Sequence, residues 1–170
     1  MIILGQVNQG AGLADMQITT KLLNVIQKND FSSPLHGATI ALSIIYMKTN
    51  QLRVSEKLAV PDSMHELDRI PPDLVLLRVI ARNIIHWDDM EASAEWVENQ
   101  IPAILRGSGD QKMSVIPMYY SVLSGICFSL GLRFAGSANS AAFTTLFAFY
   151  DNISKNLTNG MLSVGSLAVL

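Results

Sequence analysis

Charged side chains are scarce in this sequence, and their signs nearly balance. Only 15% of the 170 residues are Asp, Glu, Lys or Arg, and the net charge is -2. In ordinary soluble domains, roughly a quarter of all residues are charged. A chain without a basic surplus lacks the electrostatic footprint of a protein that binds nucleic acid or an anionic membrane. We therefore expect neither nucleic acid nor membrane among its partners.

Cysteine is nearly absent as well. Cys127 is the single cysteine and cannot form a disulfide within the chain, which favours a reducing compartment. The N-terminal "MIILGQVNQG" has no basic stretch before an apolar one, so we predict no signal peptide. The C-terminal "GSLAVL" stops within an apolar pattern. We expect both ends to continue into a longer protein.

Motifs for catalysis and metal binding are also lacking. The histidines His36, His65 and His86 have no metal-ligand spacing and no thiolate companion. Cys127 has no basic neighbour in the sequence, which favours a buried apolar role over that of a nucleophile. The adjacent carboxylates in "HWDDME" point apart and suit a solvated turn better than acid–base catalysis. We predict no catalytic, cofactor-binding or metal-binding residues.

One glycine pattern imitates a dinucleotide-binding loop. "QGAGLAD" places Gly10 and Gly12 before a predicted helix, and Asp30 lies where a ribose-binding acid would be. Against this interpretation, Asp15 occupies the third glycine position and no second strand precedes Asp30. A dinucleotide-binding enzyme stays a remote alternative.

Apolar residues are plentiful and fall at helical spacing almost throughout the chain. Apart from an ambiguous stretch at residues 1–4, we predict no strand, and the fold class is all-α. An uncharged window at 113–132 is long enough to cross a bilayer, but its serines and tyrosines favour burial within protein. The predicted helices cover residues 16–26, 35–47, 51–60, 73–87, 92–106 with a disturbance at Pro102, 117–134 and 137–155.

Two arginines interrupt an otherwise apolar helix. Arg78 and Arg82 lie one turn apart on the predicted helix 73–87. Guanidinium groups in such places usually meet carboxylates, so we expect Asp68, Asp73 or an adjoining subunit to pair with them. We interpret both as structural or interface residues.

The sequence repeats itself at a spacing of 88 residues. Placing Gly37 on Gly125 aligns "GATIALSIIYMKTNQ" with "GICFSLGLRFAGSAN" without a gap. A glycine within a helix costs about 1 kcal/mol relative to alanine, so recurring small residues indicate close approach of another helix. The expected repeat-packing residues are Gly37, Ala41, Ser43, Gly125, Ser129, Gly131 and Gly136.

The repeating unit is a helical hairpin of roughly 40 residues, within the usual range for solenoid repeats. One helical-repeat domain then covers the chain. Its parts are a partial repeat at 1–30, a repeat at 34–61, an inserted helical section at 62–112, a second repeat at 113–157 and the start of a further repeat at 158–170.

The segments "HGATIALSIIYMKTN" and "SGICFSLGLRFAGSAN" resemble proteasome/cyclosome repeats. These repeats occur in two scaffold subunits of the proteasome regulatory particle and in the largest subunit, subunit 1, of the anaphase-promoting complex. The inserted "PDLVLLRVIARNIIHWDDM" and "WVENQIPAIL" resemble the family of the anaphase-promoting complex, also called the cyclosome, more closely than the proteasome family. The resemblance covers about residues 34–150. Lys48 and Ser43 depart from it, since each stands where the repeat favours glycine.

The resemblance implies a solenoid or closed toroid of helical hairpins with an inserted helical section. It also implies a non-catalytic scaffold in a multisubunit E3 ubiquitin ligase that controls the metaphase–anaphase transition and mitotic exit. The implied partners are platform subunits and coactivator, the implied location is nucleus and cytoplasm, and no cofactor is implied. A scaffold of the proteasome regulatory particle is the alternative.

Overall fold

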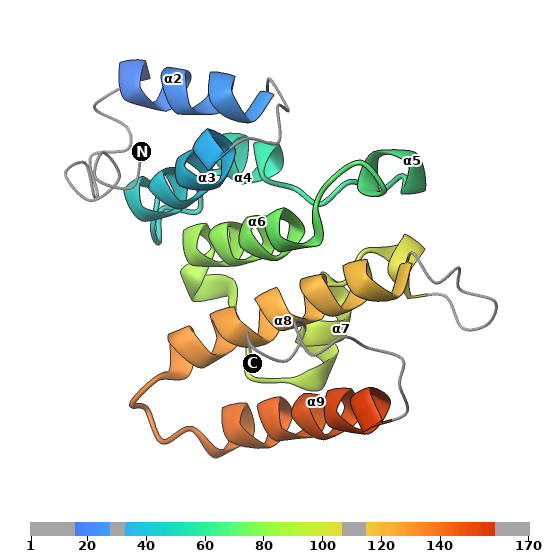
Figure 1. Ribbon diagram of the computed structural model, residues 1–170. Helices are drawn as coiled ribbons and strands as arrows, with labels where there is room; N and C mark the ends of the chain where they lie inside the picture. Colours follow the sequence, from blue (N-terminus) through green and yellow to red (C-terminus); the bar gives the residue numbers. More distant parts are fainter. Residues whose placement is uncertain (1–15, 28–32, 107–114, 159–170) are drawn as a thin grey trace. The chain divides into compact units, whose positions relative to one another are not determined.

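The computed structural model describes residues 16–27, 33–106 and 115–158, and these ranges contain helices and no strand (Figure 1). The predicted all-α class is confirmed. The possible strand at 1–4, the Gly10–Gly12 pattern and the predicted further repeat at the C-terminus lie outside the described residues. The elements are α2 (Met16–Gln27), α3 (Ser33–Ile45), α4 (Leu52–Lys57), α5 (Met64–Leu67), α6 (Pro72–Ile85), η1 (Trp87–Asp89), α7 (Ala94–Gln100), η2 (Ala103–Leu105), α8 (Val115–Phe134) and α9 (Ser140–Thr158).

The chain divides into two compact units, and α6 contributes to both. The first unit comprises Met1–Val60 and Leu77–Asp89, and the second comprises Pro61–Leu76 and Met90–Leu170. Within the described ranges, no helix combines the length and apolar character that a membrane span needs.

In the first unit, α2 packs against the hairpin of α3 and α4. Leu22, Leu35 and Leu42 are buried in its core, as their helical spacing predicts. The hydroxyl groups of Thr19 and Tyr46 share a hydrogen bond of 2.8 Å, which links α2 to the end of the α3 segment.

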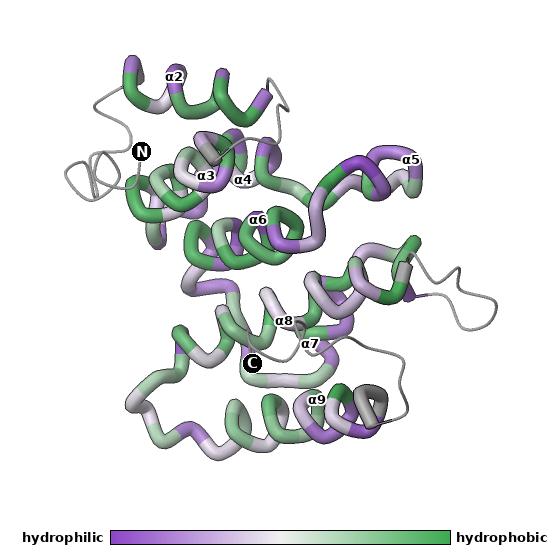
Figure 2. Tube along the Cα trace, viewed as in Figure 1, coloured by the Kyte–Doolittle hydropathy of each residue, from purple (hydrophilic) through white to green (hydrophobic). Residues whose placement is uncertain are grey.

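In the second unit, α8 and α9 form a longer hairpin, and α7 and η2 pack against α8. Leu123, Ile126 and Leu130 are buried along α8, and Ile153 is buried on α9. Figure 2 shows mainly apolar residues along α8 and the first half of α9.

The helix predicted at 92–106 with a disturbance at Pro102 is divided at that point into α7 and η2. The Ser93 hydroxyl accepts a hydrogen bond of 3.1 Å from the Trp96 amide and caps α7. Ile101 then adopts an extended conformation, as expected for a residue before proline, and the chain resumes as η2. The short helix α5 was not predicted. The Ser63 hydroxyl caps its start, because it accepts a hydrogen bond of 3.4 Å from the Glu66 amide and donates one of 3.1 Å to the Glu66 carboxylate.

The two hairpins turn through the same backbone conformation. Lys48 and Asn50 follow α3 with φ of 60° and 51°, and Gly136 and Ala138 follow α8 with φ of 72° and 52°. Each residue of the second pair lies 88 positions after its counterpart, which is the spacing of the sequence alignment. Left-handed conformations are rare outside glycine, so two such residues in the same order are a specific signature.

Hydrogen bonds in the two turns repeat at the same spacing. The Thr49 hydroxyl donates to the Tyr46 carbonyl at 2.8 Å, and the Ser137 hydroxyl donates to the Phe134 carbonyl at 2.7 Å. The backbone amides of these two residues donate to the same carbonyls. The alignment of Gly37 with Gly125 therefore pairs turns of equivalent geometry as well as similar residues.

The turn conformation predicts opposite effects for two substitutions. Gly136→Ala should destabilise the chain by about 1 kcal/mol, because a β-carbon penalises the left-handed conformation. Lys48→Gly should stabilise it by a smaller amount, since glycine relieves that penalty but loses more entropy on folding. Urea unfolding of both variants measures this. An unchanged midpoint for Gly136→Ala would contradict the positive φ at this position.

Candidate interaction surface

The first hairpin turn is docked on the C-terminal end of α6. The Lys48 amide donates to the Ile84 carbonyl at 3.1 Å, and the Asn50 amide donates to the Ile85 carbonyl at 3.2 Å. The last carbonyls of a helix have no partner within the helix, so these amides satisfy two of them. The ammonium of Lys48 lies 3.6 Å from the Asp88 carboxylate, but both groups are exposed and the pair adds little.

A second link joins α4 to the same end of α6. Nε2 of His86 lies 2.9 Å from Oγ of Ser55, and Nδ1 lies 3.2 Å from Oδ2 of Asp89. His86 follows the last residue of α6. Sequence analysis did not single out Ser55, because the two residues lie 31 positions apart and share no motif.

The order serine, histidine, aspartate imitates a nucleophilic triad, but the geometry does not support one. Ser55 is 2% exposed, so a substrate has no access to its hydroxyl. Its hydroxyl hydrogen points to the Leu52 carbonyl at 3.0 Å rather than to the imidazole. A nucleophile must pass its proton to the base, so this serine is placed as a structural hydrogen-bond partner.

Removing the imidazole tests this structural role. His86→Ala should destabilise the first unit by about 1–2 kcal/mol, because the buried Ser55 hydroxyl loses a partner. Asp89→Asn is the matched control, with an expected change below about 0.5 kcal/mol, since the carboxylate is exposed. Thermal unfolding compares the two. Equal losses would show that the Ser55 contact carries no stability.

The predicted repeat-packing residues differ in their surroundings. Ala41, Ser43, Gly125 and Ser129 are buried, and Gly37 is half-buried. The Ser43 hydroxyl donates to the Ile40 carbonyl and the Ser129 hydroxyl to the Gly125 carbonyl, each at 2.7 Å. These bonds within the helix satisfy the hydroxyls, so the helices bury polar residues without a partner from outside.

The helix contact expected at Gly131 is not found within the described part of the chain. A β-carbon at Gly131 would meet no atom within 4 Å, and the residue borders open space. Gly136, also expected to be a repeat-packing residue, is exposed and instead serves the turn through its positive φ.

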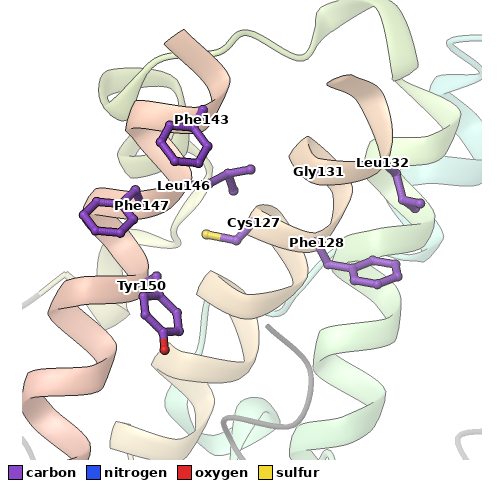
Figure 3. Close-up of a pocket in the computed structure, with 8 residues that line it drawn as sticks. All are labelled: Cys127, Phe128, Gly131, Leu132, Phe143, Leu146, Phe147 and Tyr150. Carbon is purple, nitrogen blue, oxygen red and sulfur yellow. The ribbon is translucent and has the colours of Figure 1, made fainter. Parts of the chain in front are cut away.

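This open space is an apolar groove between α8 and α9. Its volume is about 370 Å³. In Figure 3, Cys127 and Leu146 project between the two helices, while Phe143, Phe147 and Tyr150 follow α9 along the margin. The residues that line the groove are Cys127, Phe128, Gly131, Leu132, Phe143, Leu146, Phe147 and Tyr150.

Several large apolar side chains of the groove are exposed. Phe143 and Phe147 are 71% and 60% exposed, and their rings stack with centroids 6.0 Å apart. Tyr150, Phe128 and Leu132 are exposed as well. A contiguous apolar patch of this kind marks an interaction surface rather than a solvated face.

Arg78 is buried, as the sequence predicted, and burial lowers the pKa of its guanidinium. No ion pair joins it to any residue in the described ranges, and its Nε has no hydrogen-bond partner there. The expected pairing with Asp68 or Asp73 is therefore not found for Arg78. The interface role of Arg78 and Arg82 stays a prediction.

No group of three His, Cys, Asp or Glu residues in the described ranges could hold a metal ion. His36 lies in the first turn of α3, and His65 is exposed on α5. Asp88 and Asp89 are exposed on η1, in agreement with the predicted solvated turn.

Cys127 should react slowly with thiol reagents. Burial raises the pKa of its thiol to about 12, so the thiolate is scarce at pH 8. Labelling by iodoacetamide at pH 8 should be about a thousandfold slower in the folded chain than in urea, from the thiolate fractions alone. Mass spectrometry follows the single cysteine. Comparable rates in both conditions would contradict the buried, unreactive thiol.

Comparison with known proteins finds a matching family model and several similar proteins. The sequence model of the family described as APC1 fifth domain matches residues 1–166. Anaphase-promoting complex subunit 1 of Schizosaccharomyces pombe is 42% identical over 163 residues, which cover 89% of this chain and 11% of that protein. The "Negative regulator of mitosis" of Emericella nidulans is 37% identical, over 88% of this chain and 8% of that protein.

The human relative, also anaphase-promoting complex subunit 1, is 38% identical over 126 residues, covering 66% of this chain and 6% of that protein. The chain thus spans about a tenth or less of the length of the relatives it matches. The family match extends over both helical hairpins and the section between them. The chain belongs to the APC1 fifth-domain family.

Proposed function

We propose that this chain is a segment of a non-catalytic scaffold subunit of the anaphase-promoting complex, an E3 ubiquitin ligase of the cell cycle. The observation that carries the proposal is the repeated hairpin turn in a chain of the APC1 family. Stacked hairpins bury a continuous core and make extended surfaces for other proteins. The names of the relatives support the complex and its role in mitosis.

The proposed absence of catalysis is supported by the side chains themselves. Ser55 is inaccessible and its proton is engaged, and burial keeps the Cys127 thiol neutral. Instead of reactive groups, the second unit presents an apolar groove with exposed aromatic rings. Such a surface binds other protein segments through burial of apolar area.

The proposed partners are other subunits of the complex, including platform subunits and coactivator, and the proposed location is nucleus and cytoplasm. Nucleic acid and membrane are not proposed partners, because the net charge of -2 offers no basic surplus. A scaffold of the proteasome regulatory particle is less favoured, since the relatives described above carry the cyclosome name or a mitotic one.

Purification of the full-length tagged protein tests the assignment. Subunits of the anaphase-promoting complex should copurify with it, and proteasomal ATPases should not. Recovery with the proteasome alone would overturn the proposal.

The non-catalytic role has its own test in the assembled complex. Ser55→Ala and Cys127→Ala should leave the rate of substrate ubiquitination unchanged at equal complex concentration, because neither group can act as a nucleophile. A ubiquitination assay with purified complex measures this. Loss of activity in a variant that still assembles would show that the residue takes part in the chemistry.

A further inference from the structure

Within the first unit, the turn between α3 and α4 contacts the C-terminal end of a helix that follows it in the chain. The turn amides of Lys48 and Asn50 hold the last carbonyls of α6, and Ser55 of α4 meets His86 just beyond that helix. All these contacts involve the part of α6 from Leu77 onward, which belongs to this unit. The turn therefore binds the C-terminus of a helix through its backbone amides.

The second hairpin has the same turn without such a helix. Gly136 and Ala138 repeat the φ values of Lys48 and Asn50, yet their amides have no hydrogen-bond partner within the described ranges. Phe143 lies 88 positions after Ser55, and it is 71% exposed where Ser55 is buried. The position on α9 that corresponds to the buried Ser55 of α4 is thus exposed.

We propose that the groove between α8 and α9 receives the next helix of the same full-length polypeptide, and that this helix ends on the amides of Gly136 and Ala138. Its last carbonyls accept hydrogen bonds from these two amides, as Ile84 and Ile85 do in the first hairpin. Its apolar face covers Phe143 and its neighbours. This inference rests on the proposed scaffold of stacked hairpins and specifies which groups of this hairpin hold the helix that follows it.

Chain direction supports an occupant from the same polypeptide. α9 begins beside the turn and ends at Thr158, so a following helix that returns antiparallel to α9 brings its C-terminus to the turn (Figure 1). A return path of this kind spans about 28 Å, which is the length of the 19-residue α9 at 1.5 Å per residue. The relatives are about ten times longer than the matched region, so the polypeptide has ample chain for this helix.

The shape of the groove also specifies which kinds of side chain the proposed helix directs into it. The space beside Gly131 accepts a large apolar side chain, because no described atom lies within 4 Å of a β-carbon there. The occupant is therefore an amphipathic helix with one bulky apolar residue near its C-terminal turn.

Hydrogen exchange in the full-length protein, free of other subunits, tests the inference. The amides of Gly136 and Ala138 should exchange at least about tenfold more slowly than the intrinsic rates of an unpaired turn, as should those of Lys48 and Asn50. The Lys48 turn is the internal reference, since its bonds are present in the structure. Fast exchange at the second turn with a protected first turn would overturn the inference.

A charged substitution in the groove gives a second measurement. In Phe143→Asp/Phe147→Asp, protection of Gly136 and Ala138 should fall at least about tenfold, while the first turn keeps its protection and reports a folded chain. Ala148→Asp, at an exposed position of α9 outside the groove, is the matched control and should leave protection unchanged. Unchanged protection in the double variant would overturn the inference.

Protection that arises only after other subunits are added would assign the groove to a different subunit and also overturn the inference. The proposed function fails separately. A protected turn in a protein that does not copurify with the anaphase-promoting complex would remove the function and leave the inference standing.

Discussion

Two backbone amides in the turn after α3 satisfy two carbonyls at the end of α6, and these bonds join α6 to the first hairpin. The left-handed conformation of Lys48 and Asn50 aims both amides at α6. Carbonyls at a helix C-terminus otherwise depend on water or a capping residue. The contact uses only main-chain atoms, so it does not depend on the side chain of Lys48.

Satisfied polar groups explain how such apolar helices stay specific. Ser43 and Ser129 return their hydroxyls to carbonyls of their own helices, so they are buried and present only a small apolar contour. Ser55 instead reaches across to His86. Together these contacts fix which helix faces meet, while burial of leucine and isoleucine supplies most of the stabilisation.

Sequence periodicity was sufficient for the longer helices and for the alignment of the two hairpin turns, because both follow from spacing that can be counted in the sequence. It was insufficient where geometry depends on distant partners. The Ser55–His86 contact joins positions 31 apart, and the bonds from Lys48 to α6 involve main-chain atoms that no side-chain pattern encodes. Gly131 fits the small-residue pattern, but the pattern does not specify which helix fills the space beside this glycine.

The dependence of the first hairpin on a later helix sets an order of events during synthesis. The carbonyls that accept from Lys48 and Asn50 emerge about 35 residues after the turn itself, which is roughly 2–7 s at ordinary rates of translation. During this interval the turn amides and the adjoining apolar surface are open on the nascent chain.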